Sequence, residues 1–339
     1  MQRKGISMQR KGIRMTIVRG LAAVVLLAVA GQAGGVEVEE WRVPWPDTRP
    51  RDPYVGPDGE IWFVGQKGDY VASLDPKRGE FKRHDLDDGA GPHNVIVDDA
   101  GILWYAGNRA AHIGRLDPRT GDLRKFPMPR SEARDPHTLA FGPNGNIWFT
   151  VQVGNFIGRL DPRDGQVELI KVPTERALPY GIIVGRDGRP WFTEFGSNKL
   201  GSVDPDTLEL KEATLPRQEA RPRRLVMSED GDVWYVDYSG GYLGRFDPDS
   251  GEFEEWRVPG GADAKPYGMA IDDRDCVWFV ETGSDPNRLV GFDTDGERFI
   301  DGTDIDSGGG TVRHMYYHAP TGSVWFGTDT NTIGRADVS

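Results

Sequence analysis

Residues 136–173, PHTLAFGPNGNIWFTVQVGNFIGRLDPRDGQVELIKVP, form one copy of a unit that repeats along nearly the whole chain. Four short apolar or alternating runs lie within it, at 138–141, 147–151, 156–160 and 167–172, and turn residues bound each of them. Runs of this length and pattern predict four β-strands joined by tight turns. Four strands repeated radially are typical of one blade of a propeller.

The tryptophan of this unit recurs at intervals of 42 to 47 residues. Its seven copies are Trp62, Trp104, Trp148, Trp191, Trp234, Trp278 and Trp325. A period of this size is typical of solenoids, propellers and repeat arrays. We therefore predict an all-β fold, a seven-bladed β-propeller over residues 37–339.

The two ends of the repeat region complement each other. Residues 39–44, EEWRVP, are identical to residues 254–259, the last strand of the fifth unit. The final unit stops after residues 333–336, which correspond to a third strand. We therefore expect the N-terminal strand to complete the C-terminal blade, which closes the ring and removes exposed sheet edges.

Residues 1–33 have the pattern of a secretory signal peptide. A basic start is followed by LAAVVLLAVA at 21–30 and then by small residues. This apolar run is too short to span a bilayer comfortably, so we expect cleavage, a periplasmic or secreted protein and no membrane span afterwards. The formal charge of −12 argues against a nucleic-acid partner. We expect a monomer that binds a small molecule, without an internal disulfide because Cys276 is the single cysteine.

One position of the repeat has a polar or ionisable side chain in every unit. The residue eleven before each tryptophan is always Arg, His or Tyr: Arg51, His93, His137, Tyr180, Arg223, Tyr267 and His314. The first six directly follow a proline, and three of the chain's six histidines occupy this position. Because it opens the innermost strand of each blade, we expect all seven side chains to surround one mouth of the central channel. We call them the inner ring.

A second position, three residues after each tryptophan, gives carboxylates in units four to six: Glu194, Asp237 and Glu281. We expect these acids on the same face as the inner ring. Coupled titratable groups in a concavity predict an active site. A repeated position can also be purely structural, and an Arg–Glu lattice across the channel is that alternative.

Residues 179–201, PYGIIVGRDGRPWFTEFGSNKLG, resemble the blade of the virginiamycin B lyases, also called streptogramin lyases. The resemblance covers essentially the whole mature chain. It implies seven blades and a magnesium-dependent enzyme that linearises a cyclic depsipeptide by elimination at its ester. A neutral imidazole would take the proton next to the carbonyl, and the cation would polarise the ester oxygen.

The family's functional positions map partly onto this chain. The resemblance implies that His314 is the base and that Asp329 is one magnesium ligand. The second magnesium carboxylate would stand at Val312, and a substrate-contacting histidine at Tyr267. Arg313 replaces the proline that precedes the base.

The pseudo-symmetry of the ring permits a rotated version of the site. In that version His93 and the segment Asp135-Pro136-His137 take the family's places, with His137 as base, and Gln152 stands where the downstream acid is expected.

Three functions therefore remain open from the sequence. The first is a secreted lyase with His314 or His137 as base, magnesium or, alternatively, calcium as the metal, and Asp329, Glu281, Glu194 and Asp237 as candidate metal ligands. The second is a binding propeller that captures an anionic or glycan-like ligand with Arg51, Arg223 and the other inner-ring residues. The third is a lactonase or other hydrolase that uses Glu194, Asp237 and Glu281. Fold alone does not decide among them.

Overall fold

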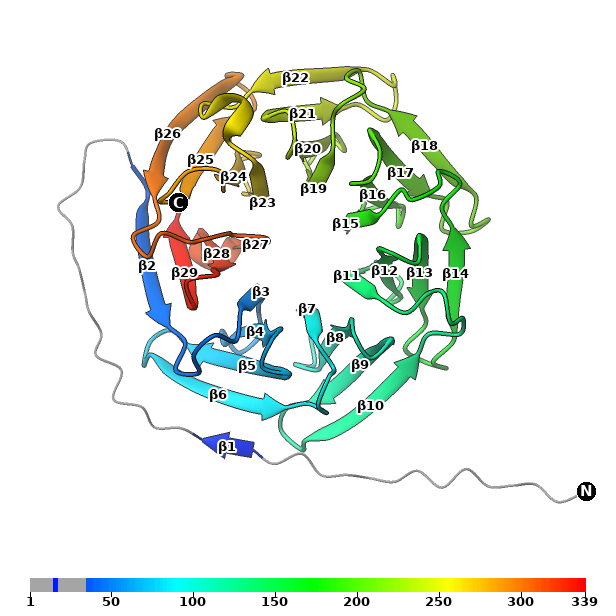
Figure 1. Ribbon diagram of the computed structural model, residues 1–339, viewed down its shortest axis with the longest axis vertical. Helices are drawn as coiled ribbons and strands as arrows, with labels where there is room; N and C mark the ends of the chain where they lie inside the picture. Colours follow the sequence, from blue (N-terminus) through cyan, green and yellow to red (C-terminus); the bar gives the residue numbers. More distant parts are fainter. Residues whose placement is uncertain (1–14, 18–34) are drawn as a thin grey trace, which may run out of the picture.

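The computed structural model describes residues 15–17 and 35–339, and these form seven antiparallel sheets arranged in a circle (Figure 1). Within each sheet the strands run from the centre outward, with every strand paired to its neighbour in the sheet. The predicted all-β fold with seven blades is confirmed.

Six blades each consist of four consecutive strands, and their bounds are as follows. Blade 1 contains β3 (Pro50–Val55), β4 (Ile61–Gly65), β5 (Tyr70–Asp75) and β6 (Glu80–Asp85). Blade 2 contains β7 (Pro92–Val97), β8 (Leu103–Gly107), β9 (His112–Asp117) and β10 (Asp122–Pro127). Blade 3 contains β11 (Pro136–Phe141), β12 (Ile147–Val151), β13 (Phe156–Leu160) and β14 (Val167–Lys171).

Blade 4 contains β15 (Pro179–Val184), β16 (Pro190–Glu194), β17 (Lys199–Val203) and β18 (Leu210–Thr214). Blade 5 contains β19 (Pro222–Met227), β20 (Val233–Asp237), β21 (Tyr242–Phe246) and β22 (Phe253–Arg257). Blade 6 contains β23 (Pro266–Ile271), β24 (Val277–Glu281), β25 (Arg288–Asp293) and β26 (Arg298–Asp304). Blade 7 combines β27 (Met315–His318), β28 (Ser323–Gly327) and β29 (Thr332–Asp337) with β2 (Glu37–Arg42). Two single-turn 3-10 helices, η1 (Gly261–Asp263) and η2 (Ala319–Thr321), and a short strand, β1 (Met15–Ile17), complete the described elements.

The aromatic residue after each blade tryptophan explains why a glycine recurs in the third strand. Tyr105, Phe149 and Phe192 lie directly opposite Gly114, Gly158 and Gly201 on the neighbouring strand. A Cβ atom built on any of these glycines would lie 2.0–2.1 Å from the aromatic ring. In these three blades only glycine leaves room for the ring to cover the third strand, whereas blades 1 and 6 have Ala72 and Val290 at this position.

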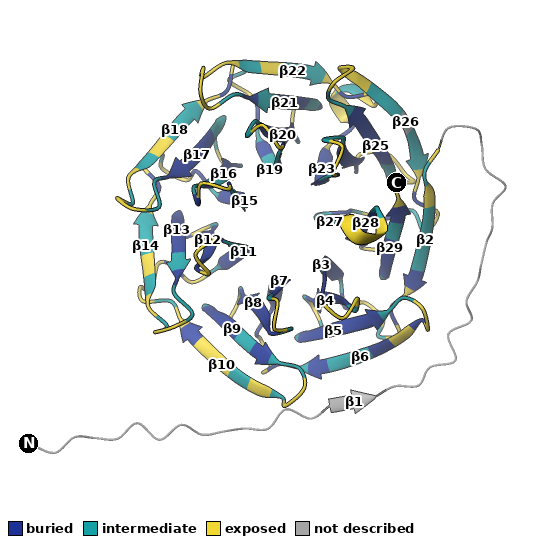
Figure 2. Cartoon of the chain, turned by 180° about the vertical axis from the view of Figure 1, so that it is seen from behind, coloured by how far each residue is buried: buried dark blue, intermediate teal, exposed yellow. Residues whose placement is uncertain are grey.

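The hydrophobic core lies between neighbouring blades rather than at the centre of the circle. One cluster joins Trp104 and Phe126 of blade 2 to Phe149 of blade 3, for example. The inner strands are mostly buried and the outermost strands carry the exposed residues (Figure 2). Each blade thus contributes one face to each of two cores, so the ring is stable only when it is closed.

The ring is closed by β2, which pairs with β29 from Glu37–Asp337 to Arg42–Thr332, as predicted (Figure 1). Trp41 of β2 stacks on Trp325 of β28 with ring centroids 5.5 Å apart. Asn331 donates from Nδ2 to the carbonyl oxygens of Val43 and Trp45, both at 3.0 Å. These contacts join residues nearly 290 positions apart, so the first strand of the domain secures its last blade.

The predicted signal peptide lies outside the described residues except for Met15–Ile17. This short strand pairs with β6 at the outer edge of blade 1. Among the residues that the structure describes, no helix has the length and apolar character needed to cross a membrane.

Candidate functional site

The inner ring occupies the same place in every blade. Six of its members are the second residue of the innermost strand, and His314 directly precedes β27. In most blades the strand then shifts register against its neighbour, as between Pro136 and Leu139, so a β-bulge follows the ring position. A bulge redirects a side chain away from the regular alternation of the strand, and here the redirected side chains lie on the propeller axis.

Contacts between blades show that the inner ring converges. The rings of His93 and His137 lie 3.6 Å apart, and those of His137 and Tyr180 lie 4.2 Å apart. The hydroxyl groups of Tyr180 and Tyr267 share a short hydrogen bond between blades 4 and 6. The guanidinium of Arg223 lies 3.9 Å from the centre of the Tyr267 ring. Residues spread over the whole sequence thus form one cluster.

A second layer of polar residues was not recognised in the sequence. It consists of the residues that directly follow the inner ring in blades 1, 2, 3 and 5, which we call the floor: Asp52, Asn94, Thr138 and Arg224. A comparison of the repeats could have found these residues, because blades 4 and 6 have glycine at this position whereas blades 1, 2, 3 and 5 have a polar residue. Asp52 has a left-handed φ of 51°, a conformation that aspartate tolerates better than most residues and that is often found at functional sites.

Arg224 spans the axis of the propeller. From blade 5 it donates to the Thr138 hydroxyl at 3.1 Å, to the Arg313 carbonyl at 2.9 Å and to the Asp52 carboxylate at 3.5 Å. Asp52 also accepts from Asn94 at 3.1 Å and from Arg51 at 2.9 Å. A buried polar network therefore crosses the centre of the circle of blades drawn in Figure 1 and joins blades 1, 2, 3, 5 and 7.

The histidines of the inner ring are held neutral. Burial lowers the pKa of His93 and His137 well below the usual range, and the neighbouring arginines lower it further. Burial also lowers the pKa of His314 to about 4; Asp52 opposes this shift, and Arg224 and Arg51 add to it. At neutral pH the imidazole nitrogens can accept a proton, as a general base must.

Tyr180 and Tyr267 differ in acidity although they share a hydrogen bond. Burial alone would raise the pKa of Tyr180, but the guanidiniums of Arg223, Arg224 and Arg51 lower it to about 8. Burial and the neighbouring Tyr180 raise the pKa of Tyr267. Of the two hydroxyl groups, Tyr180 therefore loses its proton more readily than an ordinary tyrosine, and Tyr267 less readily.

Arg223 is enclosed by aromatic rings, two of which sequence reasoning missed. Phe195 and Tyr238 lie 4.4 Å from its guanidinium carbon, in addition to Tyr180 at 5.0 Å and Tyr267 at 3.9 Å. Both missed residues stand four positions after a blade tryptophan, the position that Asp329 holds in blade 7. Reading this position in every repeat would have found them.

The carboxylates predicted in units four to six are buried but lie apart, each within its own part of the ring. Glu194 accepts from the Ser197 hydroxyl at 2.7 Å, Asp237 pairs with Arg217 at 2.7 Å, and Glu281 accepts from the Gly260 amide at 2.7 Å. Burial raises the pKa of Glu194 to about 7, with Ser197 opposing the shift and Glu212 adding to it. Burial likewise raises the pKa of Glu281. The structure does not bring these three side chains together.

The surroundings of Asp329 decide whether a divalent cation fits. Both carboxylate oxygens pair with the Arg313 guanidinium, one at 2.7 Å, and Arg49 lies 3.6 Å away. Val312, at the place of the family's second carboxylate, is fully buried, and its side chain has no atom that could bind a metal. Among the described residues, no group of three or more His, Cys, Asp or Glu side chains is placed to hold a metal. As arranged, these donors do not fit magnesium, which requires several oxygen ligands in octahedral geometry.

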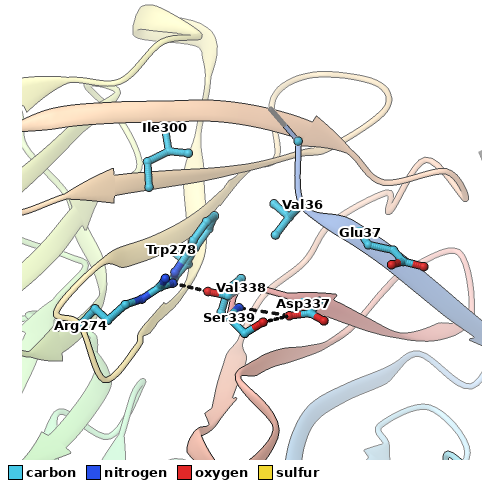
Figure 3. A pocket seen from close by; sticks show the side chains of 9 residues that line it. Val36, Glu37, Arg274, Trp278, Ile300, Asp337, Val338 and Ser339 are labelled. Carbon is cyan, nitrogen blue, oxygen red and sulfur yellow. Dashed lines mark hydrogen bonds between the residues drawn. The ribbon is translucent and has the colours of Figure 1, made fainter. Parts of the chain in front are cut away.

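Two surface hollows lie away from the inner ring. One, of about 390 Å³, lies between blades 6 and 7 and is lined by Arg274, Trp278 and the segment from Asp337 to Ser339 (Figure 3). The Arg274 guanidinium there donates to the Val338 carbonyl. The other, of about 430 Å³, is formed by the turns between the first two strands of blades 4, 5 and 6. Neither contains an inner-ring residue.

The fold and the site together define a seven-bladed propeller with a buried cluster of histidine, tyrosine and arginine on its axis. The chain belongs to the virginiamycin B lyase family, whose model matches residues 36–336. Among solved structures it is similar to a streptogramin B lyase, with a TM-score of 0.81 and 28% identity over 90% of this chain and 98% of that one. Virginiamycin B lyase from Staphylococcus aureus matches with a TM-score of 0.81 and 24% identity over 90% of this chain and 100% of that one.

A catalytically inactive variant of the Staphylococcus aureus enzyme with quinupristin, in which a histidine is replaced by alanine, matches equally well, with a TM-score of 0.81 and 24% identity. At this identity the likeness to the Staphylococcus aureus enzyme establishes the fold. Among curated proteins, none matches this chain significantly.

Proposed function

We propose that the protein is a carbon–oxygen lyase of the streptogramin lyase type that opens an ester or lactone of a cyclic depsipeptide-like compound by elimination. Family membership and the likeness to a streptogramin B lyase at 28% identity support this proposal. The inactive histidine variant with quinupristin supports a histidine as the essential residue and a cyclic depsipeptide as the substrate.

The observation that carries the proposal is the state of His314. Its side chain is partly accessible, yet its Nδ1 atom is buried and has no hydrogen-bond partner among the described residues. His93 and His137, by contrast, bond through Nδ1 to the His137 carbonyl at 3.1 Å and the Thr138 hydroxyl at 2.8 Å. His314 is thus a neutral imidazole with unused hydrogen-bonding capacity, and this favours it over His137 as the base.

The proposed step conserves atoms and electrons. His314 takes the proton from the carbon next to a carbonyl, and the electron pair of that C–H bond forms a carbon–carbon double bond. The adjacent carbon–oxygen bond breaks, and its electrons leave with the ester oxygen as a carboxylate. No water is consumed, and the imidazolium returns its proton to solvent afterwards.

Arg313 pairs with the carboxylate of Asp329, so this carboxylate is not free to hold magnesium or calcium. Magnesium dependence stays a prediction from the family resemblance. Turnover measured before and after treatment with a chelator tests it.

We also propose that the protein is exported, since residues 1–33 carry the pattern of a signal peptide. Cell fractionation with N-terminal sequencing of the mature protein tests this, and a cytoplasmic protein with an intact N-terminus would contradict it.

A non-catalytic binding propeller is the second candidate, and the enclosure of Arg223 by four aromatic rings favours it. A hydrolase that relies on Glu194, Asp237 and Glu281 has no comparable support, because these acids lie apart.

Turnover of quinupristin by wild type, His314→Ala and His318→Ala separates these functions. His318 lies at the other end of β27 and bonds to the Thr321 hydroxyl at 2.9 Å, so its replacement is a matched control in the same blade. We expect wild type and His318→Ala to open the ring and His314→Ala to lose at least about a hundredfold in rate, the scale of general-base catalysis. An intact antibiotic with wild type would remove the antibiotic-lyase assignment.

A further inference from the structure

We propose that Arg51, Arg223 and Arg224 form a carboxylate-binding site on the axis of the propeller, which holds the carboxylate that the elimination releases. The role in the reaction rests on the proposed function, whereas the binding of a carboxylate does not. The site would supply, from side chains, the positive charge that a metal would otherwise supply.

The charge balance of the cluster is the first argument. Arg51 and Arg224 share a single buried carboxylate, Asp52, at 2.9 and 3.5 Å. The contacts of Arg223 within the described residues are with aromatic rings. Three guanidiniums against one carboxylate leave two positive charges uncompensated, in a protein whose overall formal charge is −12. Buried charges are normally paired, because removing them from water is costly.

Unused hydrogen-bond donors are the second argument. Arg51 is only 4% exposed, and it donates from Nε to Asp52 and from Nη1 to Gln66 at 3.2 Å. Its Nη2 atom, like Nε of Arg223, is buried without a partner among the described residues. A planar carboxylate is the group that matches guanidinium donors best, often in bidentate geometry.

The surroundings of Arg223 indicate what the carboxylate is attached to. Phe195 and Tyr238 are partly exposed and flank its guanidinium. Their faces offer apolar and aromatic contact beside the charge. The ligand chemistry that fits is therefore a carboxylate on an apolar or aromatic body.

The position of the arginines relative to His314 connects the site to the reaction. Arg224 donates to the carbonyl of Arg313, the residue that precedes the base, and both Arg224 and Arg51 act electrostatically on the His314 imidazole. Asp52 favours the imidazolium that forms on His314, whereas Arg224 and Arg51 disfavour it. A carboxylate held by these arginines would neutralise their charge at the moment when His314 becomes positive. Such stabilisation of developing charge is usually a large contribution to catalysis.

Benzoate is the probe for this site, and benzamide, which has the same shape but no charge, is its control. Calorimetry and thermal unfolding would be measured at constant chloride concentration, so that a general salt effect is held fixed. We expect one benzoate to bind per chain and to raise the midpoint of unfolding, and benzamide to do neither.

Variants locate the binding. We expect Arg223→Gln to weaken benzoate binding by roughly tenfold or more, the scale of a charged hydrogen bond. Arg186→Gln is the matched control, because Arg186 pairs with Glu229 on the surface and its side chain is 80% exposed. Circular dichroism checks that Arg223→Gln remains folded, and Arg51→Gln provides a second variant with the same expected direction.

The proposal is overturned if wild type does not bind benzoate, or if Arg223→Gln and Arg51→Gln both bind it as tightly as wild type. Failure of benzoate binding together with His314-dependent turnover would reject the carboxylate site and leave the lyase standing. Benzoate binding without turnover of quinupristin would support the site and count against the antibiotic-lyase function.

Discussion

At the scale of single residues, the site depends on arginines placed against aromatic rings. Tyr180 lies between His137 and Tyr267, and Arg223 and Arg224 lie 5.0 and 5.2 Å from its ring. A cation favours the ionised form of a nearby phenol, whereas burial favours the neutral form. The cations prevail at Tyr180, so its titration reports on the charge of the site.

Absorbance at the tyrosinate band should therefore reveal one tyrosine that ionises near pH 8. In Arg223→Gln the pKa of this tyrosine should rise toward 10, because one of the three cations that lower it is removed. Arg186→Gln should leave the titration unchanged. A wild-type protein whose tyrosines all ionise above about pH 10 would contradict the described electrostatics.

At the scale of elements, β2 is the strand on which closure depends. It comes from the opposite end of the chain and contributes Trp41 to the core between blades 7 and 1. Its counterpart in blade 5, Trp256, stacks on Trp234 at 5.4 Å, but β22 follows β21 directly in the chain. The same sequence, EEWRVP, thus serves as closure in one blade and as an ordinary outer strand in another.

Trp41→Ala should lower the free energy of unfolding by about 3–5 kcal/mol, the usual cost of removing a buried tryptophan. Trp256→Ala, in the identical hexapeptide, should cost less, since Trp256 is only partly buried and its strand remains held by the chain. Equilibrium unfolding in urea measures both. An equal or smaller loss for Trp41→Ala would show that β2 is not the critical strand.

The strands were predictable because the repeat displays its pattern seven times. The expected strand at 156–160 has the observed bounds, and the pairing of residues 37–44 with the last blade followed from a letter-for-letter match. The interior of the site was less predictable. Positions along each strand can be read from the repeat, and Glu194 and Glu281 lie opposite Pro179 and Pro266, next to the inner ring. The direction of each side chain cannot be read in this way, and both carboxylates bond to partners close to their own strands.

The contacts of the floor residues could not be predicted from the sequence for a different reason. Arg224 reaches Asp52, Thr138 and the Arg313 carbonyl across the axis, and no spacing in the sequence encodes a contact between side chains of non-neighbouring blades. The pairing of Asp329 with Arg313 was missed for a related reason: the two residues lie 16 positions apart in two different loops of blade 7, and their spacing does not show that the loops meet.

At the scale of the whole molecule, the neutral inner-ring histidines couple stability to pH. Their pKa values lie below the unfolded value of about 6.5, so the unfolded chain binds more protons in acid. Their contribution to stability is complete above pH 6.5 and is lost as the pH falls below it. Glu194 opposes this effect, because its raised pKa gives stability that is lost as the pH rises through about 7.

We expect the free energy of unfolding to decrease from pH 6.5 to pH 5, and His93→Asn to reduce the slope. The variant's unfolded chain lacks the proton that His93 would bind, and one such proton accounts for a slope of up to about 1.4 kcal/mol per pH unit. Asparagine retains a donor toward the His137 carbonyl, to which His93 bonds at 3.1 Å. Urea titrations at several pH values measure the slope, and an unchanged slope in His93→Asn would show that this imidazole is charged in the folded state.

The central claim is that the cluster on the propeller axis performs elimination with His314 as base. The most direct measurement is liquid chromatography with mass spectrometry of the product that wild type and His314→Ala form from quinupristin, in which retention separates a ring-opened isomer from the intact antibiotic and mass separates elimination from hydrolysis. We predict a ring-opened product of unchanged mass from wild type, because elimination adds no atoms, and unaltered antibiotic from His314→Ala. A product heavier by one water, or ring opening that persists in His314→Ala, would contradict the account.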